Sequence, residues 1–196
     1  FVNGGKKIKP KLLNKIQDRR GKTIFNSFDY KCLGCDRYSP NNNDLPKVKT
    51  QDRQIISKET AFQMTSILEG AVLRGTGKKL KNLNVPIAGK TGTTNDNFDA
   101  WFIGFSSDLL VGAYIGFDNP KSLGKFETGS KAALPIFKNF IQSALYKEEF
   151  KPFNIPDGIF FAPIDYDNGL KGNFSDKNII IEAFKERDIN KEINKD

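Results

Sequence analysis

The sequence predicts an α+β fold in which an antiparallel sheet packs against helices. Three short strand-like runs follow one another at 87–94, 99–105 and 109–117. The connections between them are short and rich in turn formers, which favours antiparallel hairpins. Apolar residues at helical spacing occur on either side, at 57–75 and at about 130–149. A chain of this length can bury one hydrophobic core around such a sheet.

The first quarter of the chain predicts a hairpin followed by a long loop. Strand-like runs at 12–18 and 22–28 surround an Arg-Arg-Gly turn signal. The next segment, 29–50, is polar and contains prolines and three consecutive asparagines, so we expect no regular element there. A loop of that length is usually functional or mobile.

The first predicted helix begins after Ser57, whose hydroxyl can accept a hydrogen bond from the first turn. Apolar side chains keep helical spacing until Gly75. Gly75-Thr76-Gly77 then forms a loop near the sheet, which could touch a substrate although no residue in it requires this.

The second helix is expected from about 130 to 149, with Pro135 either kinking it or marking its first turn. Its predicted buried face consists of Ala133, Ile136, Phe137, Phe140, Ile141 and Leu145. Another short hairpin is predicted at 155–172. The charged end, 185–196, is expected to be frayed or disordered.

The candidate site lies in the first of the three central strands, which carries Lys90, Thr91, Gly92 and Thr93. A lysine is unusual in a core strand because an ammonium is seldom buried unless it is paired. Side chains alternate, so Lys90 and Gly92 share one face while Thr91 and Thr93 share the other. Both sets reach one ligand only along the strand's edge, where an extended peptide can add as a further strand. Its terminal carboxylate would meet the ammonium and both hydroxyls.

The same residues admit other interpretations. Gly-Lys-Thr ends the phosphate-loop motif G-x-x-x-x-G-K-[ST], but that motif needs a glycine at position 84, which is Asn84. A phosphate loop must also open a helix, whereas 99–105 has the pattern of a strand. A structural strand containing Lys-Thr-Gly by chance is the third possibility.

Further motifs occur in a fixed order around this strand. The central runs are 87–94 and 99–105, and the flanking segments are 2–5, 60–64, 75–77 and 132–137. As an ordered set they resemble penicillin-binding transpeptidases, specifically the class A bifunctional enzymes, for which Lys-Thr-Gly is one of three active-site motifs. The resemblance covers roughly residues 1–170.

The resemblance implies the fold and the domain boundaries. It predicts the antiparallel sheet of the penicillin-binding/β-lactamase-like transpeptidase fold, with only its C-terminal part present. Residues 1–170 would belong to this domain, with 29–50 as a loop within it, and 171–196 would be a C-terminal extension. The chain does not begin with Met, so we expect it to be a piece of a longer polypeptide.

The resemblance also implies the chemistry. Such enzymes attack the D-Ala-D-Ala bond of a peptidoglycan stem peptide with a serine and pass the acyl group to another stem's amine. Carried over, Lys90 supports the substrate carboxylate and the proton-relay serine, and Thr91 and Thr93 bind the carboxylate. The backbone N–H of Thr93 would be an oxyanion donor, and Gly92 would let the substrate approach closely.

The partners implied are peptidoglycan stem peptides, β-lactam antibiotics and the upstream remainder of the same polypeptide. The implied location is the periplasmic face of the bacterial inner membrane, with the anchor in that remainder, which would also carry a glycosyltransferase.

The nucleophilic serine is expected upstream, so we assign no catalytic residue to this chain. Ser122 begins a Ser-x-x-Lys match and Ser39 a Ser-x-Asn match. Both lie in loops, beside Pro120 and Pro40, and are best explained by chance. We therefore expect the chain alone to be inactive.

Composition sets further limits. The chain of 196 residues is 38% hydrophobic and carries a net charge of +8. That charge would permit nucleic-acid contacts. However, the positive residues are nearly all lysines, scattered along the chain without interleaved aromatic residues, and we expect no nucleic-acid partner.

The chain contains no His, which excludes Ser-His-Asp catalysis on it and His metal ligands. Its two cysteines, Cys32 and Cys35, cannot complete a four-ligand zinc site. A small disulfide between them is favoured, with free thiols as the alternative. We expect no metal and no cofactor.

Two other functions stay open from the sequence. A serine β-lactamase or DD-carboxypeptidase fragment would share the Lys-Thr-Gly strand but usually lacks the class A flanking segments. A non-catalytic module would only hold stem peptides or a partner protein at its sheet edge.

Overall fold

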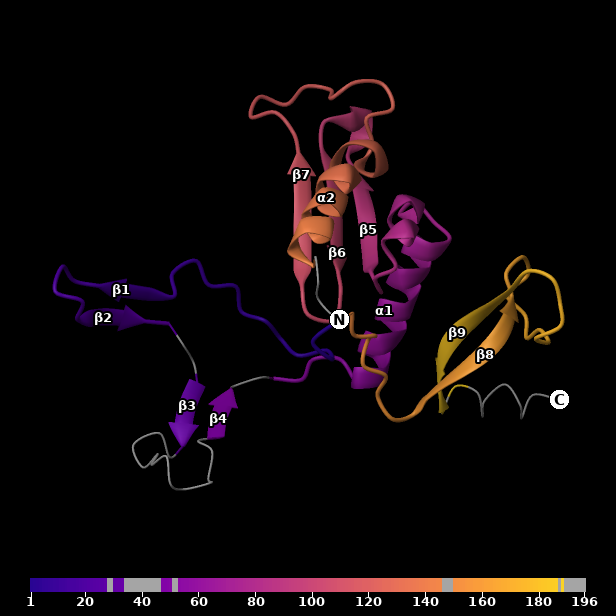
Figure 1. Ribbon diagram of the computed structural model, residues 1–196, viewed down its shortest axis with the longest axis horizontal. Coiled ribbons are helices and arrows are strands. Elements are labelled where there is room, and N and C mark those ends of the chain that lie inside the picture. Colours follow the sequence, from indigo (N-terminus) through magenta and orange to yellow (C-terminus); the bar gives the residue numbers. More distant parts are fainter. Residues whose placement is uncertain (28–29, 34–46, 51–52, 146–149, 187, 189–196) are drawn as a thin grey trace. The chain divides into compact units, whose positions relative to one another are not determined.

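The computed structural model describes residues 1–27, 30–33, 47–50, 53–145, 150–186 and 188. It contains two compact units, a larger one formed by 1–5 with 56–196 and a smaller one formed by 6–55. The predicted sheet and both predicted helices belong to the larger unit (Figure 1).

The central sheet confirms the three predicted strands. It consists of β5 (Ala88–Thr93), β6 (Ala100–Phe105) and β7 (Leu110–Ile115), all antiparallel and in this order across the sheet. A short 3-10 turn, η3 (Asn95–Asn97), joins the first two strands. At the β6–β7 turn the hydroxyl of Ser106 accepts a hydrogen bond from the amide of Leu109 (3.2 Å).

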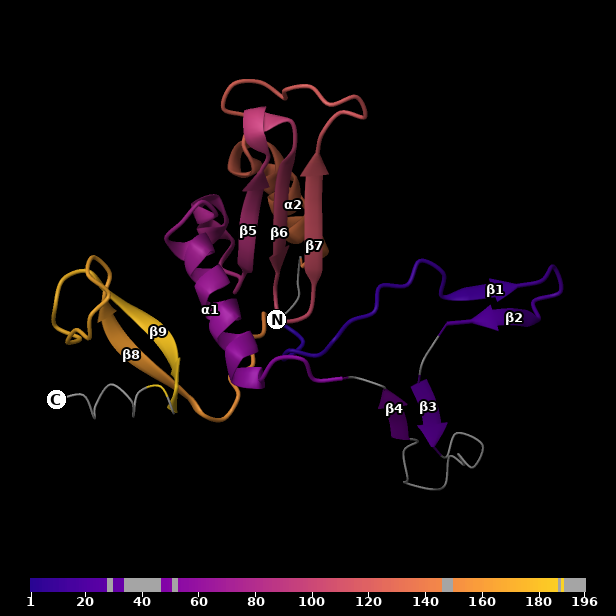
Figure 2. The ribbon, with the colours of Figure 1, turned by 180° about the vertical axis from the view of Figure 1, so that it is seen from behind.

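Two helices border this sheet. The first, α1 (Lys58–Leu73), begins where predicted, because the Ser57 hydroxyl accepts a hydrogen bond from the Thr60 amide (3.2 Å). It lies alongside β5 and is followed by η2 (Lys78–Leu83). The second, α2 (Leu134–Ala144), lies across one face of the sheet, in front of it in Figure 1 and behind it in Figure 2.

Between the sheet and α2 lies the core. Phe102 of β6 and Phe137 of α2 are both buried, with ring centroids 4.7 Å apart. The other buried members of the cluster are Val72, Leu80, Ile87, Ala100, Ala113, Ala133, Leu134 and Ile141.

The predicted buried face of α2 is partly wrong, since Ile136 and Phe140 are 49% and 51% exposed while Leu134 is buried. A π-helical turn, η4 (Gly129–Ala133), precedes α2, and Pro135 lies in the first turn of α2. The buried residues of α2 are Leu134, Phe137 and Ile141, which lie three and four residues apart on one side of the helix. The buried stripe is therefore narrower than predicted.

At the C-terminal end, the strand pairing differs from the prediction. β8 (Ile159–Asp165) pairs with β9 (Ile179–Lys185) and makes only a single bridge to Lys171. The predicted hairpin within 155–172 therefore has the wrong partner strand. β9 falls inside 171–196, the segment interpreted from sequence as an extension. It ends at Lys185, so the expectation of a frayed end from 185 onward is wrong at that residue; residues 187 and 189–196 lie outside the described residues.

Side chains of α1 attach this strand to the larger unit. Gln63 donates to the carbonyl of Ala183 (3.0 Å) and Lys185 donates to the hydroxyl of Thr60 (2.7 Å). Arg74, which follows α1, forms an ion pair with Glu182 (2.6 Å). β9 is thus integrated into the unit that contains the central sheet.

The smaller unit confirms one prediction and corrects another. β1 (Lys15–Gln17) and β2 (Thr23–Asn26) form the expected hairpin. However, β3 (Tyr30–Leu33) and β4 (Lys47–Thr50) pair antiparallel, so the prediction of no regular element in 29–50 is wrong at both ends of that segment. The Pro and Asn turn signals lie mostly between these strands, in 34–46, which is outside the described residues. Cys35 and Ser39 also lie there, so the disulfide between Cys32 and Cys35 stays a prediction.

Within the described part of the chain, no helix combines the length and the apolar character needed to cross a membrane.

Candidate functional site

The site is built on β5, an edge strand. In the described part of the chain β5 pairs with β6 alone, and it leads into another strand rather than a helix, which rules out the phosphate loop. Beyond the end of β5, the amide of Thr94 donates to the carbonyl of Asp99 (3.1 Å). Inward and outward N–H groups alternate along an antiparallel strand. Because the Thr94 amide points inward, the N–H groups of Thr93 and Thr91, one and three residues earlier, point outward to the free edge.

Burial divides β5 into two halves. Ala88 and Gly89 are buried, whereas Lys90 and Thr93 are exposed. A Cβ on Gly89 would lie 2.8 Å from the ring of Phe102, so this half is packed against the core at backbone distance. In the polar half, Lys90 to Thr93, the middle residues Thr91 and Gly92 are half-buried.

The ammonium of Lys90 lies along the free edge. Its Nζ donates to the carbonyl of Thr91 (2.9 Å), which is one of the outward-facing backbone groups. Although the side chain starts on the opposite face from Thr91, its charge thus ends beside the outward carbonyl of Thr91. This is the arrangement that a ligand lying along the edge requires.

Each threonine hydroxyl of the strand is held from outside β5. The Thr91 hydroxyl lies 2.9 Å from the hydroxyl of Thr76, in the loop after α1. The Thr93 hydroxyl accepts a hydrogen bond from the amide of Gly129, at the start of η4 (3.0 Å). Neither contact was predicted from the sequence. The sequence features that belong to these two contacts are the Gly75-Thr76-Gly77 loop and the glycine at position 129.

Gly129 can be only a glycine in this position. A Cβ there would lie 2.3 Å from the carbonyl oxygen of Trp101 and 2.6 Å from that of Gly92. Real Cβ atoms do not approach backbone oxygens so closely, and the absent side chain lets the Gly129 amide reach Thr93.

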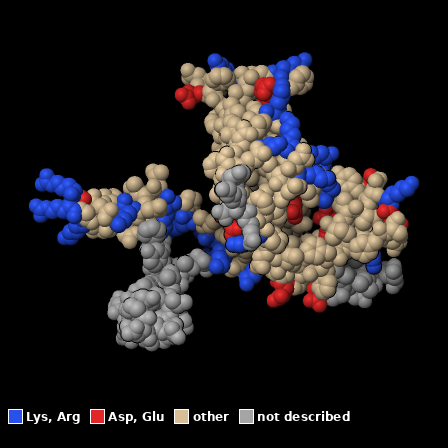
Figure 3. Space-filling model, in the orientation of Figure 1, with Lys and Arg blue, Asp and Glu red and all other residues tan. Residues whose placement is uncertain are grey.

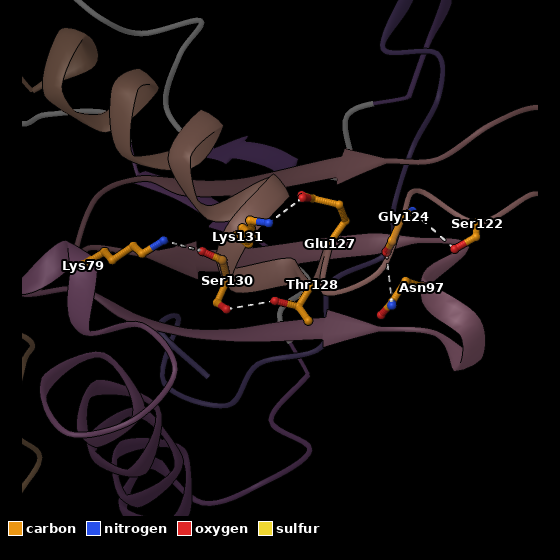
Figure 4. Close-up of polar contacts among 8 residues, drawn as sticks. All are labelled: Lys79, Asn97, Ser122, Gly124, Glu127, Thr128, Ser130 and Lys131. Carbon is orange, nitrogen blue, oxygen red and sulfur yellow. Dashed lines mark hydrogen bonds and ion pairs between the residues drawn. The ribbon is translucent and has the colours of Figure 1, made fainter.

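More polar groups gather where η4 begins (Figure 4). The hydroxyls of Thr128 and Ser130 are 3.0 Å apart, and Lys79 of η2 donates to the carbonyl of Ser130 (3.5 Å). Lys131 forms an ion pair with Glu127 one turn earlier (2.7 Å). Lys79 therefore places a second cation next to Ser130, the residue after the Gly129 amide that binds Thr93.

Ser122 serves the loop that contains it (Figure 4). Its hydroxyl donates to the carbonyl of Asp96 (2.8 Å) and accepts from the amide of Gly124 (3.2 Å). The lysine of its Ser-x-x-Lys match, Lys125, lies over the ring of Phe126. The hydroxyl thus both donates and accepts a hydrogen bond within its own loop.

The face of the sheet that carries Lys90 is apolar and open. Trp101 and Tyr114 are 40% and 48% exposed, with ring centroids 4.6 Å apart. Tyr114 donates its phenol proton to Asp99 (2.9 Å), and this hydrogen bond raises the pKa of Tyr114. Gly92 lies opposite Trp101 in the register, so the aromatic pair borders the polar half of β5.

On the face of the larger unit shown in Figure 3, Lys and Arg side chains lie in several separate groups rather than in one patch. No group of three His, Cys, Asp or Glu side chains that could hold a metal ion occurs in the described part of the chain.

Comparison with known proteins defines the class. The chain matches the model of the penicillin-binding protein transpeptidase domain over residues 1–142. It belongs to this family, which confirms the resemblance found in the sequence.

The individual relatives are penicillin-binding proteins 1A. The protein from Rickettsia conorii is 40% identical over 192 residues, which is 96% of this chain and 24% of that protein. The protein from Neisseria meningitidis serogroup B is 34% identical over 168 residues, 85% of this chain and 19% of that protein. The chain thus spans about a quarter of the length of the first of these curated relatives.

A solved structure agrees. The crystal structure of penicillin-binding protein 1A from Haemophilus influenzae superposes with a TM-score of 0.72 at 29% identity, covering 94% of this chain and 30% of that chain. The α+β fold with an antiparallel sheet packed against helices is confirmed.

Proposed function

We propose that this chain supplies one wall of the active site of a serine-type peptidoglycan transpeptidase. The polar half of β5 would hold the carboxylate end of the acyl donor. The observation that carries this proposal is the hydrogen bond of the Lys90 ammonium to the Thr91 carbonyl, on the same unpaired edge of β5 to which the N–H groups of Thr91 and Thr93 point. Family membership supports the choice of reaction, and the relatives' names favour a transpeptidase over a β-lactamase or a non-catalytic module.

In this proposal each residue of the polar half has one role. Lys90 neutralises the substrate carboxylate, and the hydroxyls of Thr91 and Thr93 donate to it; charge-assisted hydrogen bonds of this kind contribute about 1.5–3 kcal/mol each. The outward N–H of Thr93 stabilises the oxyanion of the tetrahedral intermediate. Gly92 places no side chain between the strand and the peptide backbone. The acyl donor would lie antiparallel or parallel to β5 as an added strand.

The attacking serine comes, in this proposal, from polypeptide outside these residues. Ser122 is committed to its turn, and the relatives are much longer than this chain. The donor would be a peptidoglycan stem peptide, and β-lactams would acylate the same serine because they mimic its end. The complete protein would act at the periplasmic face of the inner membrane and carry a glycosyltransferase as well.

The proposal is tested by acylation with a labelled penicillin, measured by intact mass. The product of the complete gene is expected to gain one adduct, on the serine of a Ser-x-x-Lys motif outside this chain. The 196-residue polypeptide alone is expected to keep its mass. An adduct on Ser122 or Ser39, or no adduct on the complete gene product, would contradict the proposal.

A further inference from the structure

The loop Gly75-Thr76-Gly77 has no role in the chemistry described above, yet it touches the site. It leaves the end of α1 and brings the Thr76 hydroxyl to 2.9 Å from that of Thr91. The amides of Gly75 and Gly77 both donate to the carbonyl of Ala71, at 3.1 and 3.0 Å. The loop is therefore fixed to the helix terminus rather than free to move with a ligand.

Both glycines are needed for this close attachment. A Cβ on Gly77 would lie 2.9 Å from the Cα of Val72, and one on Gly75 would lie 2.9 Å from the carbonyl oxygen of Ala71. Neither backbone atom can move aside without disturbing α1. The pattern Gly-Thr-Gly thus folds the chain tightly on the helix and leaves the threonine as the side chain that reaches β5.

We propose that Thr76 is a positioning residue of the carboxylate site, acting through Thr91. A hydroxyl has one proton to donate and can accept two hydrogen bonds. When Thr76 donates to Thr91, the proton of Thr91 is left for the substrate carboxylate. The contact also holds the Thr91 side chain in one rotamer, so the carboxylate meets a hydroxyl that is already oriented. This inference rests on the proposed function.

The contact at Thr93 follows the same logic from the other side. The Gly129 amide can only donate, so the Thr93 hydroxyl must accept from it and keeps its own proton for a ligand. The two threonines of the strand are thus each supported by one partner, Thr76 from the loop after α1 and Gly129 from η4. Thr76 is the partner that can be changed without a backbone clash.

The test compares Thr76→Val with Thr76→Ser in the product of the complete gene. Valine keeps the shape of the side chain and removes the hydroxyl, whereas serine restores it. Acylation rate constants are measured with a labelled penicillin and with its carboxylate methyl ester. Thr23→Val, an exposed threonine on β2, is the matched control, and unfolding curves establish that each variant is folded.

We expect Thr76→Val to slow acylation by penicillin about threefold to tenfold, as for the loss of one hydrogen bond. The effect on the ester should be clearly smaller, Thr76→Ser should recover most of the rate, and Thr23→Val should match the wild type. In a Thr91→Val background, Thr76→Val should have no further effect, because Thr76 acts through Thr91.

Equal slowing with penicillin and ester, or full additivity with Thr91→Val, would overturn the inference, and so would an unchanged rate in Thr76→Val. Each of these results leaves the proposed function intact, since the wild type is still acylated. A wild-type protein that is not acylated would overturn the proposed function and this inference with it.

Discussion

The two halves of β5 differ although they share one strand of six residues. Ala88 and Gly89 are buried against β6 and the core, while Lys90 and Thr93 are exposed at an edge where backbone amides point outward. The first half fixes the position of the strand, and the second half presents its polar groups. Substitutions in the core half should therefore affect stability, and those in the open half should affect ligand binding.

The largest effect is expected from the core that supports the buried half. Phe137→Ala removes a fully buried ring that packs on Phe102, and such truncations cost about 3–5 kcal/mol. The free energy of unfolding from urea denaturation measures this. Ile136→Ala, one residue earlier on α2 and 49% exposed, is the control and should cost less than about 1 kcal/mol. Equal losses of stability in the two variants would contradict the observation that Phe137 is buried and Ile136 is exposed.

β5 has one glycine in its buried half, Gly89, and one in its polar half, Gly92, so substituting each one tests the difference between the halves. An added Cβ on Gly89 would meet Phe102 at 2.8 Å and the Cα of Gly104 at 2.9 Å, whereas on Gly92 the nearest atom is the Cβ of Trp101 at 3.2 Å. Gly89→Ala should cost about 1–3 kcal/mol of stability, and Gly92→Ala should cost less. Gly92→Ala should instead slow acylation of the complete gene product. The reverse order in denaturation curves would show that the division of the strand is wrong.

Lys90→Ala tests the open half. The side chain is exposed, so the free energy of unfolding should change by no more than about 0.5 kcal/mol. Acylation of the complete gene product by penicillin should fall roughly tenfold to a hundredfold, which corresponds to one charge-assisted bond. An unaltered acylation rate would remove Lys90 from the site.

The smallest expected effect is a change in the pKa of Tyr114, one of the two aromatic residues beside the polar half of β5. Tyr114 donates to Asp99, and a neutral phenol hydrogen-bonded to a carboxylate resists deprotonation, so its pKa is raised above the ordinary value. Asp99→Asn removes that charge and should lower the pKa of Tyr114, as followed by tyrosinate absorbance. A pKa that does not fall in the variant would mean that the hydrogen bond to Asp99 is not its main cause.

Much of the larger unit could be predicted from sequence because its signals are local. The strands β5 to β7 are joined by short turns, and α1 has a capping serine and a regular apolar repeat. The Lys-Thr-Gly strand was recognisable because its residue types are out of place in a core. Its position at a sheet edge follows from the absence of a second pairing partner among the described residues.

The remaining features depend on contacts between distant residues. β8 pairs with β9 across a long connection, and β3 pairs with β4 across 34–46, so neither pair is joined by the short turn that marks a hairpin in a sequence. The contacts of Thr76 with Thr91 and of Gly129 with Thr93 join different elements. A sequence shows such residues as separate motifs, and only the fold shows that they support the same strand.

The central claim is that Lys90 at the open edge binds the substrate carboxylate, and a cycle of two changes tests it most directly. Acylation rate constants are measured for wild type and Lys90→Ala, each with a penicillin and with its carboxylate methyl ester. If the ammonium and the carboxylate interact, the loss on esterification should be at least roughly tenfold smaller in Lys90→Ala than in the wild type. The same loss in both proteins would show that Lys90 does not bind the carboxylate.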